Sequence, residues 1–134
     1  MIIRVFFIIF MEEKDLGFTY AKVRIHNPAD LTKFDEIELL VDTGAVFSSV
    51  PRPILEKLGL EPVEHRGLRV YGGARIERDI GGLLFEYSGN RAVGPVIFGE
   101  PKDTPVLGAT ALEALGYQVD PVTRQLKPTE LLMI

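Results

Sequence analysis

Cysteine is absent from all 134 residues of the sequence. Its absence excludes disulfide bonds, thiolate nucleophiles and cysteine-based metal sites. The sequence has only two histidines, His26 and His65, and neither sits in a metal-binding spacing such as HExxH. We therefore expect a protein with no metal and no cofactor. The lack of cysteine is also compatible with a reducing, cytoplasmic location.

Long apolar runs are also lacking. The most apolar segment, Met1–Phe10, is well short of the roughly 20 residues that span a bilayer. Acidic residues follow it directly, and no small-residue cleavage site of a signal peptide is present. We therefore expect no membrane partner. Residues 1–10 are either a strand that pairs elsewhere or an over-extended gene start with Met11 as the true beginning, and we favour the second.

The overall composition is that of an ordinary globular protein, with 46% hydrophobic and 25% charged residues and a net charge of -4. We expect a single domain over residues 11–134. Four arginines cluster between residues 66 and 78, but acidic residues are interleaved with them. This pattern favours a solvated hairpin face over a nucleic-acid surface, so no nucleic-acid partner is expected.

The pattern of polar and apolar residues predicts a mostly β protein with two short helices. Alternation predicts strands at 18–25, 36–41 and 92–98, and turn residues mark 27–30. Helices are predicted at 51–58 and 110–115, each followed by a glycine. Residues 63–87 predict one or two hairpins, with glycine pairs at 72–73 and 81–82 as turn points. Short strands are predicted around 120–123 and on to the C-terminus.

A faint internal repeat is present. Leu55-Glu-Lys-Leu-Gly59 matches Leu112-Glu-Ala-Leu-Gly116, and each copy follows an apolar run that ends near a glycine. Coincidence is the simpler explanation, because this pattern often ends a helix. The shared order of apolar run, glycine and short helix favours a duplication, which would give the domain an approximate internal two-fold axis.

The residues that carry chemistry lie in Leu39-Leu-Val-Asp-Thr-Gly-Ala45. An apolar strand delivers Asp42, and the chain then turns at Gly44. A carboxyl group at the end of a buried strand is expected to be partly desolvated, which suits acid–base chemistry near neutral pH. Asp-Thr-Gly alone is also an ordinary turn sequence. The apolar run before it and the Val106-Leu-Gly108 segment with a helix behind it favour the functional interpretation.

This chain resembles the retropepsin-like aspartic proteases, and more narrowly the small single-lobe members of archaea and bacteria. Three segments carry the resemblance over roughly residues 18–130: Leu39–Ala45, the hairpin Val70-Tyr-Gly-Gly-Ala74, and Pro105-Val-Leu-Gly-Ala-Thr-Ala-Leu112. In order and spacing they are similar to the active-site loop, the flap, and the apolar-apolar-glycine segment of that family. The resemblance implies an all-β, single-lobe acid-protease barrel with one or two short helices that acts as a homodimer.

The resemblance also implies the roles of individual residues. Asp42 would be the catalytic carboxylate, with Thr43, Gly44 and Ala45 in the active-site loop. Tyr71, Gly72 and Gly73 would form the flap tip that closes over a bound peptide. Retroviral members usually carry an acidic residue and an arginine where this chain has Val46 and Ala109, so a viral style of dimer clasp is not expected.

A homodimer follows from counting carboxylates. Aspartic proteolysis needs two facing carboxyl groups that share a proton, and this sequence has one Asp-Thr-Gly. The second carboxylate would come from a symmetric partner, with the terminal residues 131–134 as candidates for the interface. The expected function is that of a homodimeric aspartic endopeptidase acting on peptides or proteins. The alternatives are a non-proteolytic peptide-binding or dimerisation module on the same fold, and an inactive monomer that assembles with another protein.

Overall fold

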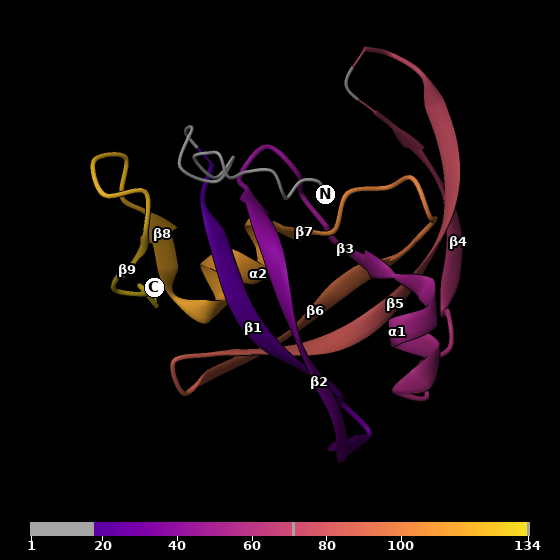
Figure 1. Cartoon of the computed structure of the whole chain (residues 1–134), viewed down its shortest axis with the longest axis horizontal. Helices are drawn as coiled ribbons and strands as arrows, with labels where there is room; N and C mark the ends of the chain where they lie inside the picture. Colours follow the sequence, from indigo (N-terminus) through magenta and orange to yellow (C-terminus); the bar gives the residue numbers. More distant parts are fainter. Residues whose placement is uncertain (1–17, 71, 134) are drawn as a thin grey trace, which may run out of the picture.

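A computed structural model describes residues 18–70 and 72–133 of the chain, and over this part it is mostly β (Figure 1). The strands are β1 (Tyr20–Asn27), β2 (Asp30–Asp42), β3 (Ser48–Pro51), β4 (Glu64–Arg69), β5 (Arg75–Tyr87), β6 (Asn90–Gly99), β7 (Val106–Gly108), β8 (Tyr117–Val119) and β9 (Leu126–Pro128). The helices are α1 (Arg52–Lys57) and α2 (Ala109–Leu115). Both predicted helices and the three predicted strands are confirmed.

Seven of these strands form one sheet in the order β1-β2-β7-β3-β6-β5-β4, and β8 pairs with β9 in a separate ribbon. β1 also pairs with β5, so the sheet curls back on itself. The β4–β5 hairpin lies at the edge of the sheet and rises beyond it at the upper right of Figure 1. This arrangement is consistent with the expected barrel-like, mostly β architecture.

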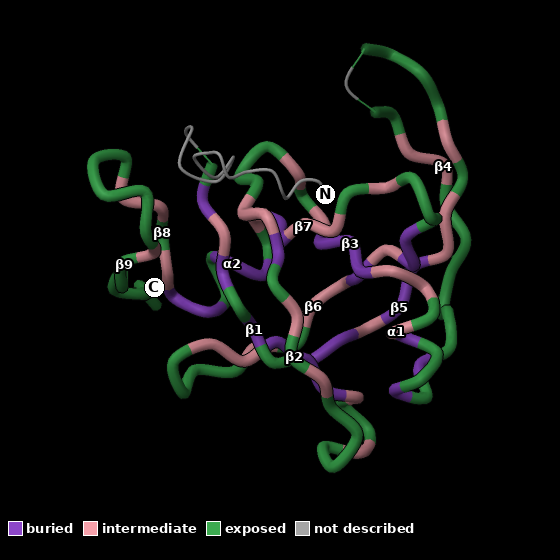
Figure 2. The backbone as a smooth tube through the Cα atoms, viewed as in Figure 1, coloured by how far each residue is buried: buried purple, intermediate pink, exposed green. Residues whose placement is uncertain are grey.

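The core lies inside the curled sheet and is closed by the two helices. In β1 the buried residues Ala21, Val23 and Ile25 alternate with exposed ones, which is the pattern that predicted a half-buried strand. Figure 2 shows that buried segments gather where strands and helices meet, whereas the hairpin ends are exposed. The largest fully buried side chains are Phe85, Phe98, Ile25, Leu39, Leu55, Leu83, Leu107 and Leu115.

The internal repeat is visible in the sheet order itself. Reading outward from the centre of the sheet, β3 matches β7, β6 matches β2, and β5 matches β1. In both halves the outer pair is antiparallel and the next pair is parallel. A short helix follows β3 in one half and β7 in the other. The fold therefore has the approximate two-fold axis that the sequence repeat predicted.

The strand register confirms this symmetry residue by residue. The offset that aligns Leu55 with Leu112 also aligns Ser49 with Val106, and these two residues pair with each other at the centre of the sheet. The same offset relates the whole β2–β7 register to the β3–β6 register. Asp42, which lies opposite Gly108, is thereby matched by Gly99, which lies opposite Pro51.

One predicted turn is wrong. Gly81 and Gly82 lie inside β5, paired with Val96 and Pro95, and the chain continues straight through them. Gly81 is explained by packing, because an added Cβ would stand 2.9 Å from Cε1 of the buried Phe98. A glycine within a strand often marks such a close approach.

The C-terminal prediction also needs correction. Residues 120–123 form a turn between β8 and β9, in which the Asp120 carboxylate accepts a hydrogen bond from the Val122 N–H at 2.8 Å. Residues 129–133 form no strand. Leu131, Leu132 and Met133 are instead exposed, at 63%, 85% and 98%. Residues 131–133 are thus an exposed apolar segment without regular secondary structure.

Candidate active site

Asp42 is the last residue of β2, and β7 lies beside it. Leu40, Val41 and Asp42 pair in parallel with Val106, Leu107 and Gly108. Leu39, deeper in the strand, is fully buried, so the strand is anchored in the core before it delivers the carboxylate. The sequence-predicted order of buried strand, aspartate and turn is therefore the local structure.

The chain turns sharply after Asp42. The Gly44 N–H donates a hydrogen bond to Asp42 Oδ1 at 3.0 Å, and the Ala45 N–H donates to the Asp42 carbonyl at 3.1 Å. An Asp side chain that accepts from the backbone two residues later forms an Asx-type turn. The turn orients one carboxylate oxygen by its own backbone and leaves the other toward solvent.

The segment from Asp42 to Phe47, called here the Asp42 loop, is fastened to the second half of the fold. The Ala109 N–H donates to the Ala45 carbonyl at 2.7 Å, and the Thr110 N–H donates to the Val46 carbonyl at 3.2 Å. Buried Ser48 accepts from the Gly108 N–H at 2.9 Å through Oγ. The loop therefore rests on a rigid support although it lies at the surface.

Gly108 is part of that support. A Cβ added there would stand 2.6 Å from the backbone carbon and oxygen of Phe47 and 2.9 Å from the Ala45 oxygen. Only glycine permits such an approach of two backbones. Ser48 and Gly108 were assigned no function from the sequence. The Val106-Leu-Gly108 segment was the sequence feature that could have identified Gly108 as a contact point.

The expected desolvation of Asp42 is absent from the single chain. Asp42, Thr43 and Gly44 are all exposed, and Ala45 is half-buried. An exposed position leaves the carboxylate solvated, so any desolvation has to come from groups outside this part of the fold that cover the loop. The structure brings the four residues of the predicted loop together on one exposed turn.

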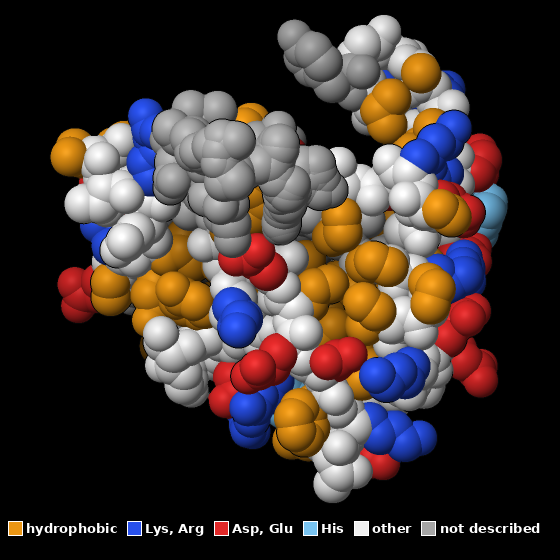
Figure 3. Space-filling model, viewed as in Figure 1, with side chains coloured by type: hydrophobic (Ala, Val, Ile, Leu, Met, Phe, Trp, Pro, Cys, Tyr) orange, Lys and Arg blue, Asp and Glu red, His pale blue; other side chains and the backbone are white. Residues whose placement is uncertain are grey.

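The predicted flap is a single β hairpin. The Val70 N–H donates to the Ala74 carbonyl at 2.9 Å and the Gly73 N–H donates to the Val70 carbonyl at 3.0 Å. Gly72 and Gly73 have φ angles of +99° and +93°, which favour glycine. Tyr71, the third predicted tip residue, lies outside the described residues. Figure 3 shows an open gap between the far end of the hairpin and the rest of the molecule.

Two ion-pair groups attach the hairpin to the rest of the fold. On one face, Arg78 binds Asp103 with Nε and one terminal nitrogen, both at 2.8 Å. The arginine hydrogen bond is the main cause that lowers the pKa of the Asp103 carboxyl. This bidentate pair joins β5 to the loop of residues 100–105, which we call the Asp103 loop.

On the opposite face, Asp79 lies between two cationic side chains. His65 Nδ1 is 2.8 Å from Asp79 Oδ1, and Arg52 of α1 reaches Asp79 Oδ2 at 2.6 Å. These hydrogen bonds, with that of His65 first, lower the pKa of the Asp79 carboxyl. The hydrogen bond to Asp79 in turn raises the pKa of His65, with Glu77 adding to the shift.

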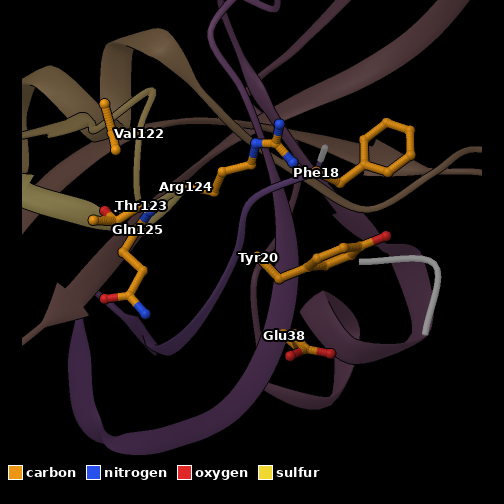
Figure 4. Close-up of a pocket in the computed structure, with 7 residues that line it drawn as sticks. All are labelled: Phe18, Tyr20, Glu38, Val122, Thr123, Arg124 and Gln125. Atoms are coloured by element: carbon orange, nitrogen blue, oxygen red, sulfur yellow. Dashed lines mark hydrogen bonds between the residues drawn. The ribbon is translucent and has the colours of Figure 1, made fainter. Parts of the chain in front are cut away.

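A pocket of about 580 Å³ is lined by residues outside the Asp42 loop. Figure 4 shows Phe18, Tyr20 and Glu38 on its β1–β2 side, facing the turn between β8 and β9. The turn contributes Val122, Thr123, Arg124 and Gln125. Asp42 does not line this pocket, and the single chain holds Asp42 on an open surface instead.

Among residues 18–70 and 72–133, no three histidine, aspartate or glutamate side chains come together in a way that could hold a metal ion. No helix there is long and apolar enough to cross a membrane.

Comparison with known proteins gives one informative result. No protein-family model and no curated protein matches the chain. Among solved structures, a retropepsin-like aspartic protease from Rickettsia conorii is similar, with 23% sequence identity, 79% of each chain covered and a TM-score of 0.52. The Simian Foamy Virus (mac) protease covers 69% of this chain and 92% of its own, at 18% identity and a TM-score of 0.48. The match to the Rickettsia structure shows that the chain has the retropepsin-like fold, which confirms the resemblance predicted from its sequence.

Proposed function

We propose that the chain is one half of a homodimeric aspartic endopeptidase in which Asp42 of each copy supplies one carboxyl group of the catalytic pair. The observation that carries the proposal is the position of Asp42, on a turn fastened to β7 and α2 in a retropepsin-like fold. Fold alone does not fix activity, so the argument rests on this residue and its geometry.

The internal symmetry explains why a second molecule is needed. The two-fold axis within the chain relates Asp42 to Gly99, which has no side chain to offer. The aspartates near the surface of the described chain are already bound to other groups, as Asp79 and Asp103 show. Asp30 binds the Thr32 hydroxyl at 2.6 Å and Asp35 pairs with Lys57 at 3.7 Å. A copy of Asp42 from a second chain is the matching partner.

In such a pair the two carboxyl groups hold one proton between them, because two like charges so close do not both ionise. The ionised group takes a proton from water as the water oxygen attacks the peptide carbonyl carbon. The protonated group gives its proton to the carbonyl oxygen. When the resulting diol collapses, the C–N bond breaks and the amine leaves with a proton from the pair. No metal or cofactor enters this sequence of steps.

In the proposed dimer, the flap binds the substrate and the C-terminal end contributes to the interface. The β4–β5 hairpin, with Gly72 and Gly73 at its tip, closes over an extended peptide. The exposed residues Leu131, Leu132 and Met133 pack against the second copy, since three exposed apolar side chains in a row favour association. Thr43 supports the pair of active-site loops where the two copies meet.

The test is the variant Asp42→Asn, assayed on a mixed peptide pool at acidic to neutral pH. Loss of the acid–base group lowers the rate of cleavage by about 10²–10⁴-fold. The fold and the dimer stay unchanged. Asp35→Asn is the matched control, because it removes an aspartate from β2 far from the turn. Cleavage by Asp42→Asn at the wild-type rate would overturn the proposal.

Mixing experiments separate the dimer from a monomeric enzyme. When wild-type chains exchange with an excess of the Asp42→Asn chain, the activity per wild-type chain falls toward zero, because nearly every wild-type chain then has an inactive partner. A monomeric catalyst would keep its activity unchanged in the mixture. Sedimentation at several concentrations reports the dimer directly, and a folded dimer that cleaves nothing would favour the non-proteolytic binding module.

A further inference from the structure

The β4–β5 hairpin has two chemically different faces. Strand pairing places Glu64, Arg66 and Leu68 on one face with Ile80, Arg78 and Ile76 opposite them. Arg78 on this face reaches Asp103 and Arg66 reaches Phe47, so this is the face turned toward the Asp42 loop and the Asp103 loop, and it is called here the inner face. A peptide held beneath the hairpin would lie along this inner face.

Arg66 and Arg78 are direct cross-strand neighbours on that face, and they reach down to the two symmetry-related loops. Arg78 binds Asp103 in the Asp103 loop, and Arg66 lies over the ring of Phe47 in the Asp42 loop. The Arg66 guanidinium carbon is 5.4 Å from the ring centroid, within the range of a cation–π contact. Phe47 is thus a platform five residues along the chain from Asp42.

The two arginines differ in their exposure and in how many N–H donors their ion pairs leave unused. Arg78 is only 11% exposed, and its bidentate pair with Asp103 uses its charge. Arg66 is 48% exposed and meets Glu64 Oε2 through Nε alone, at 2.6 Å. The guanidinium has five N–H donors, so its two terminal nitrogens keep four that this ion pair does not use. These nitrogens match the geometry of a carboxylate, and stacking on a ring leaves the donors in the guanidinium plane available.

We propose that Arg66 selects an acidic side chain of the substrate in the space between the inner face of the hairpin and the Asp42 loop. This inference rests on the proposed endopeptidase and names the substrate feature that it recognises. Arg66 is a specificity-determining residue, since its contact is with a substrate side chain and not with the bond that breaks. Glu64 competes for the same guanidinium and therefore weakens the selection.

The test uses peptide pairs that differ only by Glu or Gln, with the pair moved along successive positions on each side of the cleaved bond. In the wild-type enzyme, kcat/KM is about tenfold or more higher for Glu than for Gln at one position, as expected for a charge-assisted contact. Arg66→Gln reduces that ratio to about one, mainly by lowering kcat/KM for the Glu peptide. Glu64→Gln raises the ratio, because the competing carboxylate is gone.

The chain provides a matched control in Arg24. Its guanidinium lies 4.8 Å from the ring centroid of Phe34 and 3.2 Å from Glu36 Oε2, so it has the same two kinds of partner as Arg66, an aromatic ring and a glutamate, but on β1 and β2. Arg24→Gln removes the same charge from the same kind of contact and keeps the wild-type Glu:Gln ratio. An equal loss in both variants would show that net charge alone sets the preference and would overturn the role of Arg66.

A binding measurement separates this inference from the proposed activity. In the Asp42→Asn background, the dissociation constants of the Glu and Gln peptides differ by a similar factor, and adding Arg66→Gln removes the difference. If wild type cleaves peptides with a ratio near one at every position, the selection by Arg66 is wrong and the endopeptidase stands. If the folded dimer cleaves nothing but the binding ratio persists, the endopeptidase is wrong and the acidic preference stands.

Discussion

The Asp42 loop and the Asp103 loop occupy equivalent places in the two halves of this fold, yet they are built in opposite ways. The Asp42 loop is exposed at Asp42, Thr43 and Gly44, and its support comes from backbone hydrogen bonds to α2. The Asp103 loop turns its carboxylate inward to a bidentate arginine and to the Glu100 N–H at 2.8 Å. The Asp42 loop keeps its aspartate available, whereas the Asp103 loop uses an aspartate at a different, non-equivalent position for structure.

The largest effect is expected where the two halves touch, at Gly108. Gly108→Ala forces a Cβ to within 2.6 Å of the Phe47 backbone, which cannot rotate away as a side chain can. We expect a loss of about 3 kcal/mol in the free energy of unfolding, measured by urea denaturation, because overpacking against backbone has no cheap relief. Cleavage activity falls with it, since the Asp42 loop is displaced.

Gly99→Ala is the control for that variant in the other parallel strand pair, where Gly99 holds the place that Asp42 holds opposite Gly108. Gly99 lies opposite Pro51 in the other half, and an added Cβ there would meet Ser49 Oγ at 3.0 Å and the Val50 oxygen at 3.2 Å. We expect a cost of about 1 kcal/mol, because a small shift relieves these contacts. Equal destabilisation by the two variants would contradict the special role of Gly108.

The next effect contrasts the two aspartates. Asp103→Asn breaks the bidentate pair with Arg78 and is expected to cost about 1–2 kcal/mol of unfolding free energy. Asp42→Asn changes an exposed group and is expected to stay within about 0.5 kcal/mol of wild type. Differential scanning calorimetry of both variants checks this, and a stability loss in Asp42→Asn as large as that in Asp103→Asn would contradict the contrast between the loops.

The pH dependence of the Asp103 effect has a definite sign. The folded state lowers the pKa of Asp103 below its ordinary value of 3.8, mainly through the Arg78 hydrogen bond. The stabilisation is therefore complete above pH 3.8 and is lost as the pH falls through the lower folded-state value. The difference in unfolding free energy between wild type and Asp103→Asn should therefore narrow only below pH 3.8. The ion pair still holds the loop under mildly acidic assay conditions.

Local features of this molecule were predictable from sequence, whereas contacts between distant segments were not. Alternation identified β1, and the glycines after each helix marked the ends of α1 and α2, because those signals act within a few residues. The first half of β2 was missed because its exposed residues, such as Lys33 and Phe34, show no regular alternation. The contacts of Gly81 with Phe98 and of Arg66 with Phe47 join residues far apart in the chain, and only the folded sheet brings them together.

The smallest expected effect lies on the outer face of the hairpin, where His65 bridges Asp79 and Glu77. The hydrogen bond to Asp79 raises the pKa of His65 above its ordinary value of 6.5, so its contribution is complete below pH 6.5 and is lost as the pH rises through the folded-state pKa. His65 is 60% exposed, and solvent screens the interaction. NMR titration should give His65 a pKa above 6.5 in wild type, returning toward 6.5 in Asp79→Asn. The unfolding free energy of His65→Gln should differ only slightly from that of wild type, and only below the folded-state pKa of His65.

A larger loss of unfolding free energy than in Asp103→Asn would mean that the outer face, and not the inner Arg78 pair, holds the hairpin to the fold.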